Sequence, residues 1–447
     1  MNPTAHAILV FLQTWWVELV CGVVIVAVVP LIAGYVVLVE RKLMADMQAR
    51  LGPMRVGPHG LLQPIADAVK LLIKEDIIPD QSDKLIFWLA PVISMVAALT
   101  SMGAIAFGPT FQVARDINIG ILFVLGVSSL GFLGIILGGW ASNSHYSIIG
   151  ALRSTAQLVS YETAAGLAIV SALLLSGTLR ISAIVEAQQQ AGVWFIFLAP
   201  VAAFIYLVAS IAETNRAPFD LPEAESELVA GYMTEYSGFR WALYFLGEYA
   251  NMIVVGSVAT TLFLGGWLRP FPNVHWLAWL DWLPALIIAL IGVYSIHRAG
   301  KQPVKVQTGF MWAVGLACFA VAVIFAVPWF VAPLKVIIPG LNGAFWFLLK
   351  VSAYIYVFMW LRFTLPRYRF DQLMHLGWYI LIPLAIVNVF SVGIAMLLET
   401  EFGVTRWLAL LLTTIVTLAA AILLVRWHDK RTESASSASL APESYAG

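Results

Sequence analysis

The stretch VELVCGVVIVAVVPLIAGYVVLV, residues 17–39, decides the fold class because it is almost entirely apolar over 23 residues. A helix needs about 20 apolar residues to cross the hydrocarbon core of a bilayer. Similar runs recur along the 447 residues, the mean hydropathy is +0.89, and only 11% of the residues are charged, whereas soluble domains average about 25%. The sequence therefore predicts an all-α polytopic membrane protein and argues against a large soluble protein with an apolar core.

Eleven candidate membrane spans can be placed on the sequence, and we expect them to form a single transmembrane domain over 1–431. The tail TESASSASLAPESYAG, residues 432–447, is small and polar, and we expect it to be disordered. The candidate spans are 17–39, 85–107, 118–140, 155–177, 194–212, 241–267, 276–297, 309–333, 342–363, 374–398 and 404–426.

The basic residues indicate how these spans are oriented. With the N-terminus outside, the inner connections hold nineteen Lys and Arg residues, the outer connections hold five, and Lys350 lies within a span. Cytoplasmic loops carry the excess of basic residues in membrane proteins, so we expect the loop 213–240 to be cytoplasmic. The first 16 residues contain no Lys or Arg, so they lack the basic region of a cleaved signal peptide, and we expect the first span to be retained.

The composition also bears on metal and nucleic-acid chemistry. The formal net charge is zero, which gives no signal for binding a polyanion. The two cysteines, Cys21 and Cys318, lie far apart in apolar runs and cannot by themselves hold an iron–sulfur cluster or a zinc ion. Any metal redox chemistry is therefore expected in partner proteins.

The first inner connection contains an expected amphipathic helix. RLGPMRVGPHG, residues 50–60, has two Gly-Pro pairs, which break helices and stiffen the chain. LLQPIADAVKLLIKED, residues 61–76, then repeats apolar residues at helical spacing, with polar residues opposite. We expect a helix lying in the membrane interface. Its apolar face could rest on lipid or roof a cavity open to lipid, and periodicity leaves both alternatives open.

Four ionisable residues fall within expected spans or at their edges: Glu162, Glu213, Glu248 and Lys350. A charge near the bilayer centre costs about 3 kcal/mol on insertion scales, so such residues usually face a polar cavity or a partner. Tyr244 and Asn251 are helical neighbours of Glu248 and are expected to hydrogen-bond it. A structural hydrogen bond could explain any one of the four, but together they favour a proton path or a buried polar network.

The stretch ETNRAPFDLPEAESELVAGY, residues 213–232, holds five acids and one base, Arg216. Asp220, Pro222 and Glu223 have the spacing of a helix start with a capping box. Capping does not account for Glu225 and Glu227, and like charges four residues apart destabilise a helix. We therefore expect the surplus acids to serve function rather than stability.

With these residues the sequence resembles a known family. ETNRAPFDLPEAESELVAGY is similar to the H subunit of the proton-pumping NADH–quinone oxidoreductase, respiratory complex I. So are ERKLMADMQARLGPMRVGPHGLLQPIADAVKLLIKE (40–75), GWASNSHYSIIGALRSTAQLVSYE (139–162) and LPRYRFDQLM (365–374). The resemblance covers about 17–267 and 342–400.

The resemblance implies a subunit of the membrane arm, in the bacterial inner membrane, where this arm meets the peripheral arm. Such a protein contributes to a quinone-binding chamber and carries no redox centre, since FMN and iron–sulfur clusters belong to partner subunits. Its acids connect quinone reduction to proton translocation. Carried over by position, the chamber and its entrance would involve Glu40, Arg41, Arg50, Asp67, Phe245 and Arg362. The acidic path would involve Glu162, Glu213, Asp220, Glu223, Glu225, Glu227 and Glu248.

The chain departs from the eight-span core of this family in two places. A hydrophobic pair is inserted within 270–335, and an extra span follows at 404–426. Two other functions stay open at this point. One is the equivalent subunit of a membrane-bound hydrogenase or of a respiratory enzyme with another electron donor, and the other is a stand-alone proton-coupled transporter.

Overall fold

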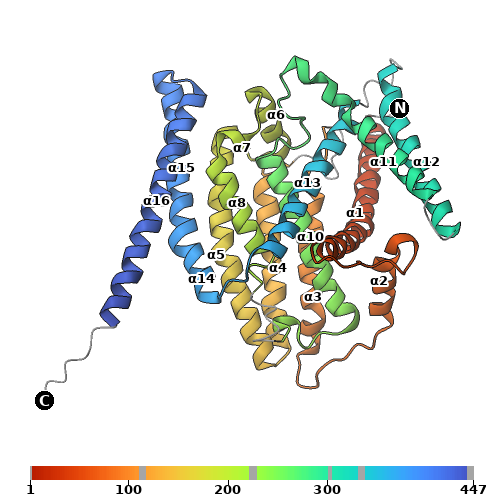
Figure 1. The fold of residues 1–447 in the computed structure, drawn as a ribbon, viewed down its shortest axis with the longest axis horizontal. Coiled ribbons are helices and arrows are strands. Elements are labelled where there is room, and N and C mark those ends of the chain that lie inside the picture. The colour runs from red at the N-terminus through yellow and green to blue at the C-terminus, as the bar shows by residue number, and fades with distance from the viewer. Residues whose placement is uncertain (1–2, 110–116, 221–228, 301–304, 331–337, 440–447) are drawn as a thin grey trace.

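The computed structural model describes residues 3–109, 117–220, 229–300, 305–330 and 338–439 as a bundle of helices (Figure 1). Among these residues, nine helical segments are long and apolar enough to cross a membrane. The chain is therefore a multi-pass membrane protein. The segments are α1 (Pro3–Met47), α3 (Lys84–Gly103), α4 (Gly120–Ala141), α5 (His145–Ser176), α10 (Gly238–Leu262), η3 with α11 (His275–Trp282, Leu283–Ala299), α12 (Lys305–Phe330), α13 (Ile338–Thr364), and α14, η5 and α15 in succession (Phe370–His375, Leu376–Leu381, Ile382–Phe402).

The two remaining predicted spans, 194–212 and 404–426, are occupied by shorter apolar helical stretches. The first corresponds to α7 (Phe195–Leu198) and α8 (Pro200–Glu213), and α8 has 14 residues. The second is the Trp407–Leu423 part of α16 (Arg406–Ser439). A total of eleven spans therefore stays a prediction. Because α16 continues to Ser439, the first part of the tail expected to be disordered is helical, while 440–447 lies outside the described residues.

The short helices lie in the connections between these spans. A helix is present at the predicted place after the Gly-Pro loop, as α2 (Gln63–Ile73), preceded by η1 (Pro58–Gly60). The outer connection after α5, where no helix was predicted, forms α6 (Ile181–Ala191), and η2 (Gly231–Met233) precedes α10. Exposed apolar side chains on and beside α2 include Leu62, Ile65, Val69, Leu72 and Ile73.

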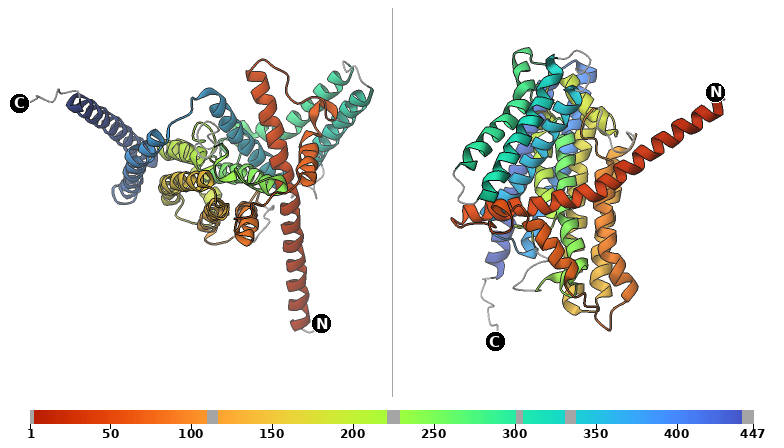
Figure 2. Two further views of the ribbon diagram at one scale, coloured as in Figure 1. Left: turned by 90° about the horizontal axis from the view of Figure 1, so that it is seen from below. Right: turned by 90° about the vertical axis from the view of Figure 1, so that its right-hand side faces the viewer.

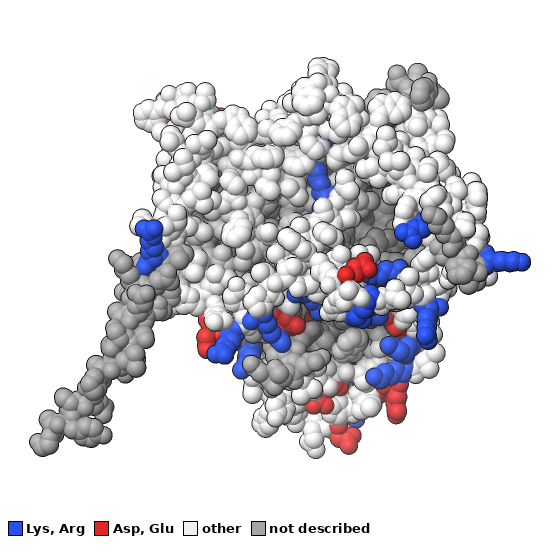
Figure 3. All heavy atoms as spheres, in the orientation of Figure 1, with Lys and Arg blue, Asp and Glu red and all other residues white. Residues whose placement is uncertain are grey.

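The two ends of the bundle are fixed by hydrogen bonds between connections. At one end, the amide of Asp83 donates to Ala141 and the amide of Tyr368 donates to Pro218. We call this the inner end, because its connections are those predicted to be cytoplasmic. At the opposite end, the amide of Ile121 donates to Leu179. Lys and Arg side chains gather in a band toward the inner end, with acids among and below them, while the rest of this face is largely uncharged (Figure 3).

The centre of the bundle is packed through small side chains. Ala164, Ala168 and Ala172 of α5 and Ala209 and Ala212 of α8 are fully buried, so the two helices approach closely. Gly166 on α5 has open space at its Cβ position, so it does not take part in this close approach. α10 is the most deeply buried of the spans.

The elements outside the expected eight-span core lie at opposite flanks. α11 and α12 pack against each other as a pair at one side, and α16 packs on α15 at the other (Figure 1). Gly292 lets the pair approach, since a Cβ there would lie 3.1 Å from the carbonyl oxygen of Gly315. The N-terminal half of α1 projects away from the bundle, whereas its C-terminal half packs on α2, α3, α10 and α13 (Figure 2).

A substitution at Gly150 tests whether the contact between α5 and η2 supports the inner end. A Cβ at Gly150 would lie 2.6 Å from the Cα atom of Gly231, and overpacking of this kind costs about 1–3 kcal/mol. Gly150→Ala is therefore expected to lower the melting midpoint of the membrane-extracted protein. Gly166→Ala on the same helix meets open space and is expected to leave the midpoint unchanged or raise it. Equal midpoints for the two variants would contradict this packing.

Candidate functional site

The functional candidates lie in three adjoining places near the inner end: a cavity beside α2, a buried group of charges, and a cavity lined by acids. The first, which we call the α2 cavity, has a volume of about 190 Å³ and lies between α1, α2 and α10. Its lining is mostly apolar, with ionised groups at one side. The lining residues are Gly34, Val37, Arg41, Pro64, Asp67, Ala68, Lys70, Leu71, Leu72, Phe239, Trp241, Ala242, Phe245 and Leu246.

An ion pair fixes the polar side of the α2 cavity. Arg41 on α1 donates to Asp67 on α2 at 2.8 Å, and Gln63 donates to the other carboxylate oxygen at 3.1 Å. Lys70 lies 3.6 Å from the same carboxylate. α2 therefore covers the cavity with residues such as Asp67 and Leu71, while Ile65 and Val69 of the predicted apolar face are exposed.

One turn of α10 connects the α2 cavity to buried charges. Phe245 lines the cavity and lies between Trp241, with ring centroids 5.0 Å apart, and Tyr249, with centroids 4.9 Å apart. The Tyr249 hydroxyl donates to Glu40 on α1 at 2.8 Å. The cavity wall and the buried charges thus share a row of aromatic rings.

Glu40, Arg216, Glu248 and Arg362 form the second place, which we call the ion network. Arg362 on α13 pairs with Glu40. Arg216 reaches both carboxylates, with Nη1 3.9 Å from Glu40 and Nη2 3.9 Å from Glu248, and its guanidinium lies 4.1 Å from the centre of the Tyr249 ring. Glu40 is 5% exposed and Arg216 is 7% exposed. Two carboxyl groups and two guanidinium groups therefore meet here, with Glu40 and Arg216 buried and the Arg362 side chain 27% exposed.

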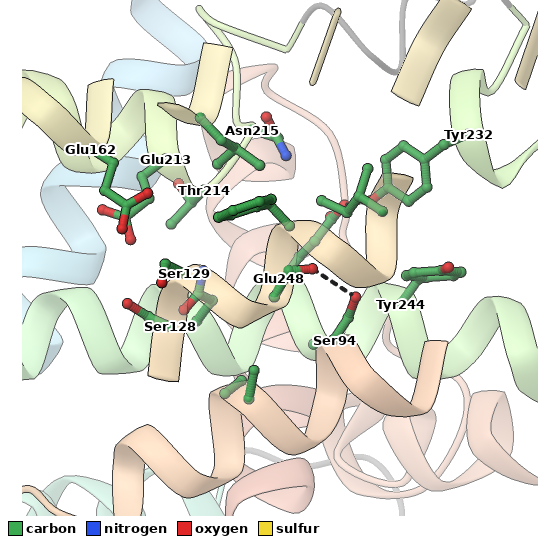
Figure 4. A pocket seen from close by; sticks show the side chains of 18 residues that line it. Ser94, Ser128, Ser129, Glu162, Glu213, Thr214, Asn215, Tyr232, Tyr244 and Glu248 are labelled. Atoms are coloured by element: carbon green, nitrogen blue, oxygen red, sulfur yellow. Dashed lines mark hydrogen bonds between the residues drawn. The ribbon is translucent and has the colours of Figure 1, made fainter. Parts of the chain in front are cut away.

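The third place, the acid cavity, has a volume of about 70 Å³ and lies between α3, α4, α5, α8 and α10. In this view Glu162 and Glu213 lie next to each other at one side, and Glu248 lies between them and Tyr244 (Figure 4). Ser94, Ser128, Ser129, Thr214, Tyr232 and Tyr244 add hydroxyl groups to the lining. A water molecule needs about 10–15 Å³ of such space and two to four polar partners, so the cavity has room for a small cluster of water.

The residues around Glu248 differ from the prediction. Tyr232 on η2 donates to Glu248 at 2.9 Å, whereas Tyr244 donates to the carbonyl oxygen of Gly134 on α4 at 2.9 Å. Tyr244 was expected to bond Glu248, but its hydroxyl reaches α4, where Gly138 leaves room for it because a Cβ at this position would collide with the hydroxyl. Asn251 lines the acid cavity.

Tyr236, which precedes α10, packs against Tyr244. Burial raises the pKa of Tyr236 to about 12, so this phenol stays neutral at physiological pH.

Lys350, which we grouped with the intramembrane acids, lies in a separate polar site. Its ammonium donates to the carbonyl oxygens of Leu264 at 2.6 Å, Gly266 at 2.9 Å and Leu268 at 2.5 Å. It also lies 4.3 Å from the centre of the Trp194 ring. These carbonyls follow the C-terminus of α10, where cations are favourable, so the bonds are those of a structural cap.

The structure also separates the residues that were assigned to the chamber. Arg41, Asp67 and Phe245 line the α2 cavity, while Glu40 and Arg362 lie beside it in the ion network. Arg50 lies at the surface and donates to Gln48 at 2.7 Å. Arg50 is not among the residues that line the α2 cavity.

The acids of the cytoplasmic stretch also divide into different places. Asp220 lies 3.9 Å from Arg367 at the inner end. Glu223, Glu225 and Glu227, together with the helix start expected there, lie outside the described residues.

Three residues of the site were absent from the predicted set: Arg216, Tyr232 and Tyr249. A signal was available for Arg216, which is the one base within 213–232 and therefore the natural counter-charge for a buried carboxylate. The tyrosines carry no comparable signal in one sequence. In the part of the chain that the structure describes, no group of three or more His, Cys, Asp or Glu residues could hold a metal ion.

The comparisons with known proteins agree on one family. Residues 20–393 match the family described as NADH dehydrogenase. The NADH-quinone oxidoreductase H subunit numbered 2 of Solibacter usitatus (strain Ellin6076) is 53% identical over 372 residues, which cover 82% of this chain and 93% of the relative. The H subunit numbered 1 of Geobacter sulfurreducens is 41% identical over 406 residues, covering 86% and 97%. The H subunit of Rickettsia canadensis is 44% identical over 372 residues, covering 83% and 91%.

Substituting Arg216 tests the charge balance of the ion network. Arg216→Gln leaves Glu248 without its counter-charge, and removing one partner of a buried ion pair typically costs about 3–5 kcal/mol. We expect a lower melting midpoint of the membrane-extracted protein, partly restored by adding Glu248→Gln, because Arg362 still balances Glu40. Arg50→Gln at the surface serves as the control. Additive effects of Arg216→Gln and Glu248→Gln would contradict the pairing.

Proposed function

The chain belongs to the family of NADH–quinone oxidoreductase H subunits, which are membrane subunits of complex I, and we propose that it binds quinone in the α2 cavity and couples quinone reduction to proton translocation through the acid cavity. One observation carries this proposal: the ion network includes a residue of the acid cavity lining, Glu248, and reaches the lining of the α2 cavity through Tyr249. Tyr249 connects Glu40 to Phe245 of the α2 cavity. Arg216 connects Glu40 to Glu248 of the acid cavity.

The α2 cavity has the character of a site for a quinone. A quinone joins a polar ring to an apolar tail, and small-molecule sites are mostly apolar with a few placed polar groups. The apolar lining suits the tail, and Arg41 supplies a donor for a quinone oxygen. At about 190 Å³ the cavity is smaller than the roughly 300–1,000 Å³ usual for a ligand site. We propose that peripheral-arm subunits of the complex complete it.

The electrons for this reaction come from partner subunits, to which the resemblance assigns FMN and the iron–sulfur clusters. The contribution of this chain is to hold and move protons. Reduction of a quinone to an uncharged quinol takes up two electrons and two protons. Until the protons arrive, the added electrons place negative charge beside the Arg41–Asp67 pair and, through Tyr249, near Glu40, and this charge favours uptake of a proton from the cytoplasmic side by Glu40. A proton gained by Glu40 would weaken its attraction for Arg216, which would then pair more strongly with Glu248.

Stronger pairing of Arg216 with Glu248 would in turn affect the acid cavity, because Glu248 is part of its lining. The carboxyl group of Glu248 shares the cavity with Glu213 and Glu162, and the cavity also has hydroxyl groups in its lining and room for water. A proton displaced from Glu248 can therefore move to Glu213 and Glu162 without crossing an apolar barrier. This order of steps requires a positioned acid at each stage, and positioned acids of this kind typically contribute about 10²- to 10⁴-fold to a rate.

We place the chain in the bacterial inner membrane with its N-terminus outside and 213–240 in the cytoplasm. The bias of basic residues supports this orientation. The names of the relatives favour a quinone enzyme over the hydrogenase alternative. They also favour a subunit among other complex I subunits over a stand-alone transporter.

Substitution of Glu248 tests the coupling step in the assembled complex. Glu248→Gln keeps the shape of the side chain and removes its proton exchange, so NADH-driven proton uptake by inverted membrane vesicles is expected to fall by at least about tenfold. Glu186→Gln on α6, where the carboxylate is 59% exposed, is the control and should pump normally. Wild-type pumping by Glu248→Gln would remove the proposed role of this acid.

A photoreactive quinone analogue tests the binding step. In the assembled complex we expect covalent labelling within 40–70 and 241–248, because these segments line the α2 cavity. Excess unmodified quinone should suppress the label. Labelling confined to partner subunits, with none on these segments, would contradict the assignment of the α2 cavity.

A further inference from the structure

The connection between α13 and α14, residues 365–369, touches the loop that carries Arg216. We infer that Arg367 is a positioning residue for the ion network, holding the loop 214–220 so that Arg216 stays between Glu40 and Glu248. This inference rests on the proposed coupling function and adds a residue to it. Arg367 does not line either cavity, so its effect would be exerted through the loop.

The loop 214–220 is held from one side by α5. Gln157 is fully buried and donates to the carbonyl oxygens of Ala212 and Phe219, each at 2.8 Å. Asn215 donates to the hydroxyl of Ser154 at 3.1 Å. These bonds fix the end of α8 and the middle of the loop against a helix in the centre of the bundle.

The connection 365–369 holds the other side of the loop. Arg367 donates to the carbonyl oxygen of Asp220 and lies 3.9 Å from its carboxylate. The amide of Tyr368 donates to Pro218 at 3.1 Å, and the rings of Tyr368 and Phe219 stack with centroids 5.6 Å apart. The loop is therefore held by hydrogen bonds to α5 on one side and to this connection on the other.

A backbone hydrogen bond joins the end of the loop that the connection 365–369 holds to Arg216. The amide of Phe219 donates to the carbonyl oxygen of Arg216 at 2.8 Å, which closes a tight turn from 216 to 219. A displacement of Asp220 would therefore move the backbone of Arg216. Arg216 spans two carboxylates at 3.9 Å each, so a small displacement would favour one carboxylate over the other.

The same connection also adjoins the other base of the ion network. Arg362, which pairs with Glu40, lies near the end of α13, five residues before Arg367. The chain from 362 to 367 therefore sets both guanidinium groups relative to Glu40: Arg362 directly, and Arg216 through Asp220. Arg367 is 39% exposed at the inner end, so loss of core packing is a smaller concern than it would be for a buried side chain.

The test compares Arg367→Gln with Arg367→Lys in membrane vesicles that contain the assembled complex. The reduction of a water-soluble acceptor by NADH measures how much complex is present, and kcat and KM are then measured with a short-chain quinone. We expect Arg367→Gln to lower kcat by roughly tenfold, since a misplaced group far from the chemistry can cost up to about 100-fold, with KM unchanged within about twofold. Arg367→Lys keeps a cation that can donate to Asp220 and should retain most of kcat.

Several results would overturn the positioning role. They are an unchanged kcat in Arg367→Gln, a fall in the quinone reductase rate that is fully explained by a smaller amount of complex, or a rise in KM alone. Should Arg367→Gln fail to assemble, a tenfold loss of kcat in assembled Arg367→Lys would overturn it as well. Arg298→Gln is the control, because that guanidinium stacks on Tyr294 of its own helix. The kcat of Glu248→Gln is measured alongside. A low kcat in Glu248→Gln with a normal kcat in Arg367→Gln would contradict the positioning role and leave the coupling function intact. A normal kcat in Glu248→Gln would contradict the coupling function itself.

Discussion

The contact of Arg216 with both Glu40 and Glu248 is the interaction on which the rest of the arrangement depends. With Arg362 it brings together groups from α1, the loop after α8, α10 and α13. Removing one partner of a buried ion pair typically costs about 3–5 kcal/mol, so these segments must meet for the charges to be tolerated. The four charged groups also favour one packing of these segments, because another packing would leave a buried charge without its partner.

The surrounding fold supplies what this contact needs. Fully buried alanines such as Ala168 and Ala209 allow close packing of α5 on α8, which places Gln157 under the loop that carries Arg216. The aromatic row from Trp241 to Tyr249 connects the α2 cavity to Glu40. Tyr232 orients Glu248 at the edge of the acid cavity. A change of charge in one cavity can therefore reach the other through contacts of a few ångströms each.

The sequence predicted the helical class and the position of each long apolar helix, because run length and composition report directly on a bilayer. It also selected Glu162, Glu213 and Glu248, since an acid in an apolar run is rare. The sequence could not distinguish Lys350, which caps α10, from the acids, which share a cavity, because each is a single charge in an apolar run. The difference depends on backbone carbonyl groups such as that of Leu264, which is far from Lys350 in the sequence. The sequence predicted Tyr244 as the hydrogen-bond partner of Glu248, whereas Tyr232 fills that place and Tyr244 bonds Gly134. Helical spacing identifies which residues are neighbours but not the direction in which a ring points.

The central claim is that quinone reduction changes the protonation of Glu248 through the ion network. Infrared difference spectra of the assembled complex, recorded between oxidised and reduced quinone, measure carboxyl protonation directly. The account predicts a carboxylic acid band that changes on reduction, disappears in Glu248→Gln, and persists in Glu186→Gln. A spectrum of Glu248→Gln that matches the wild-type spectrum in this region would contradict it.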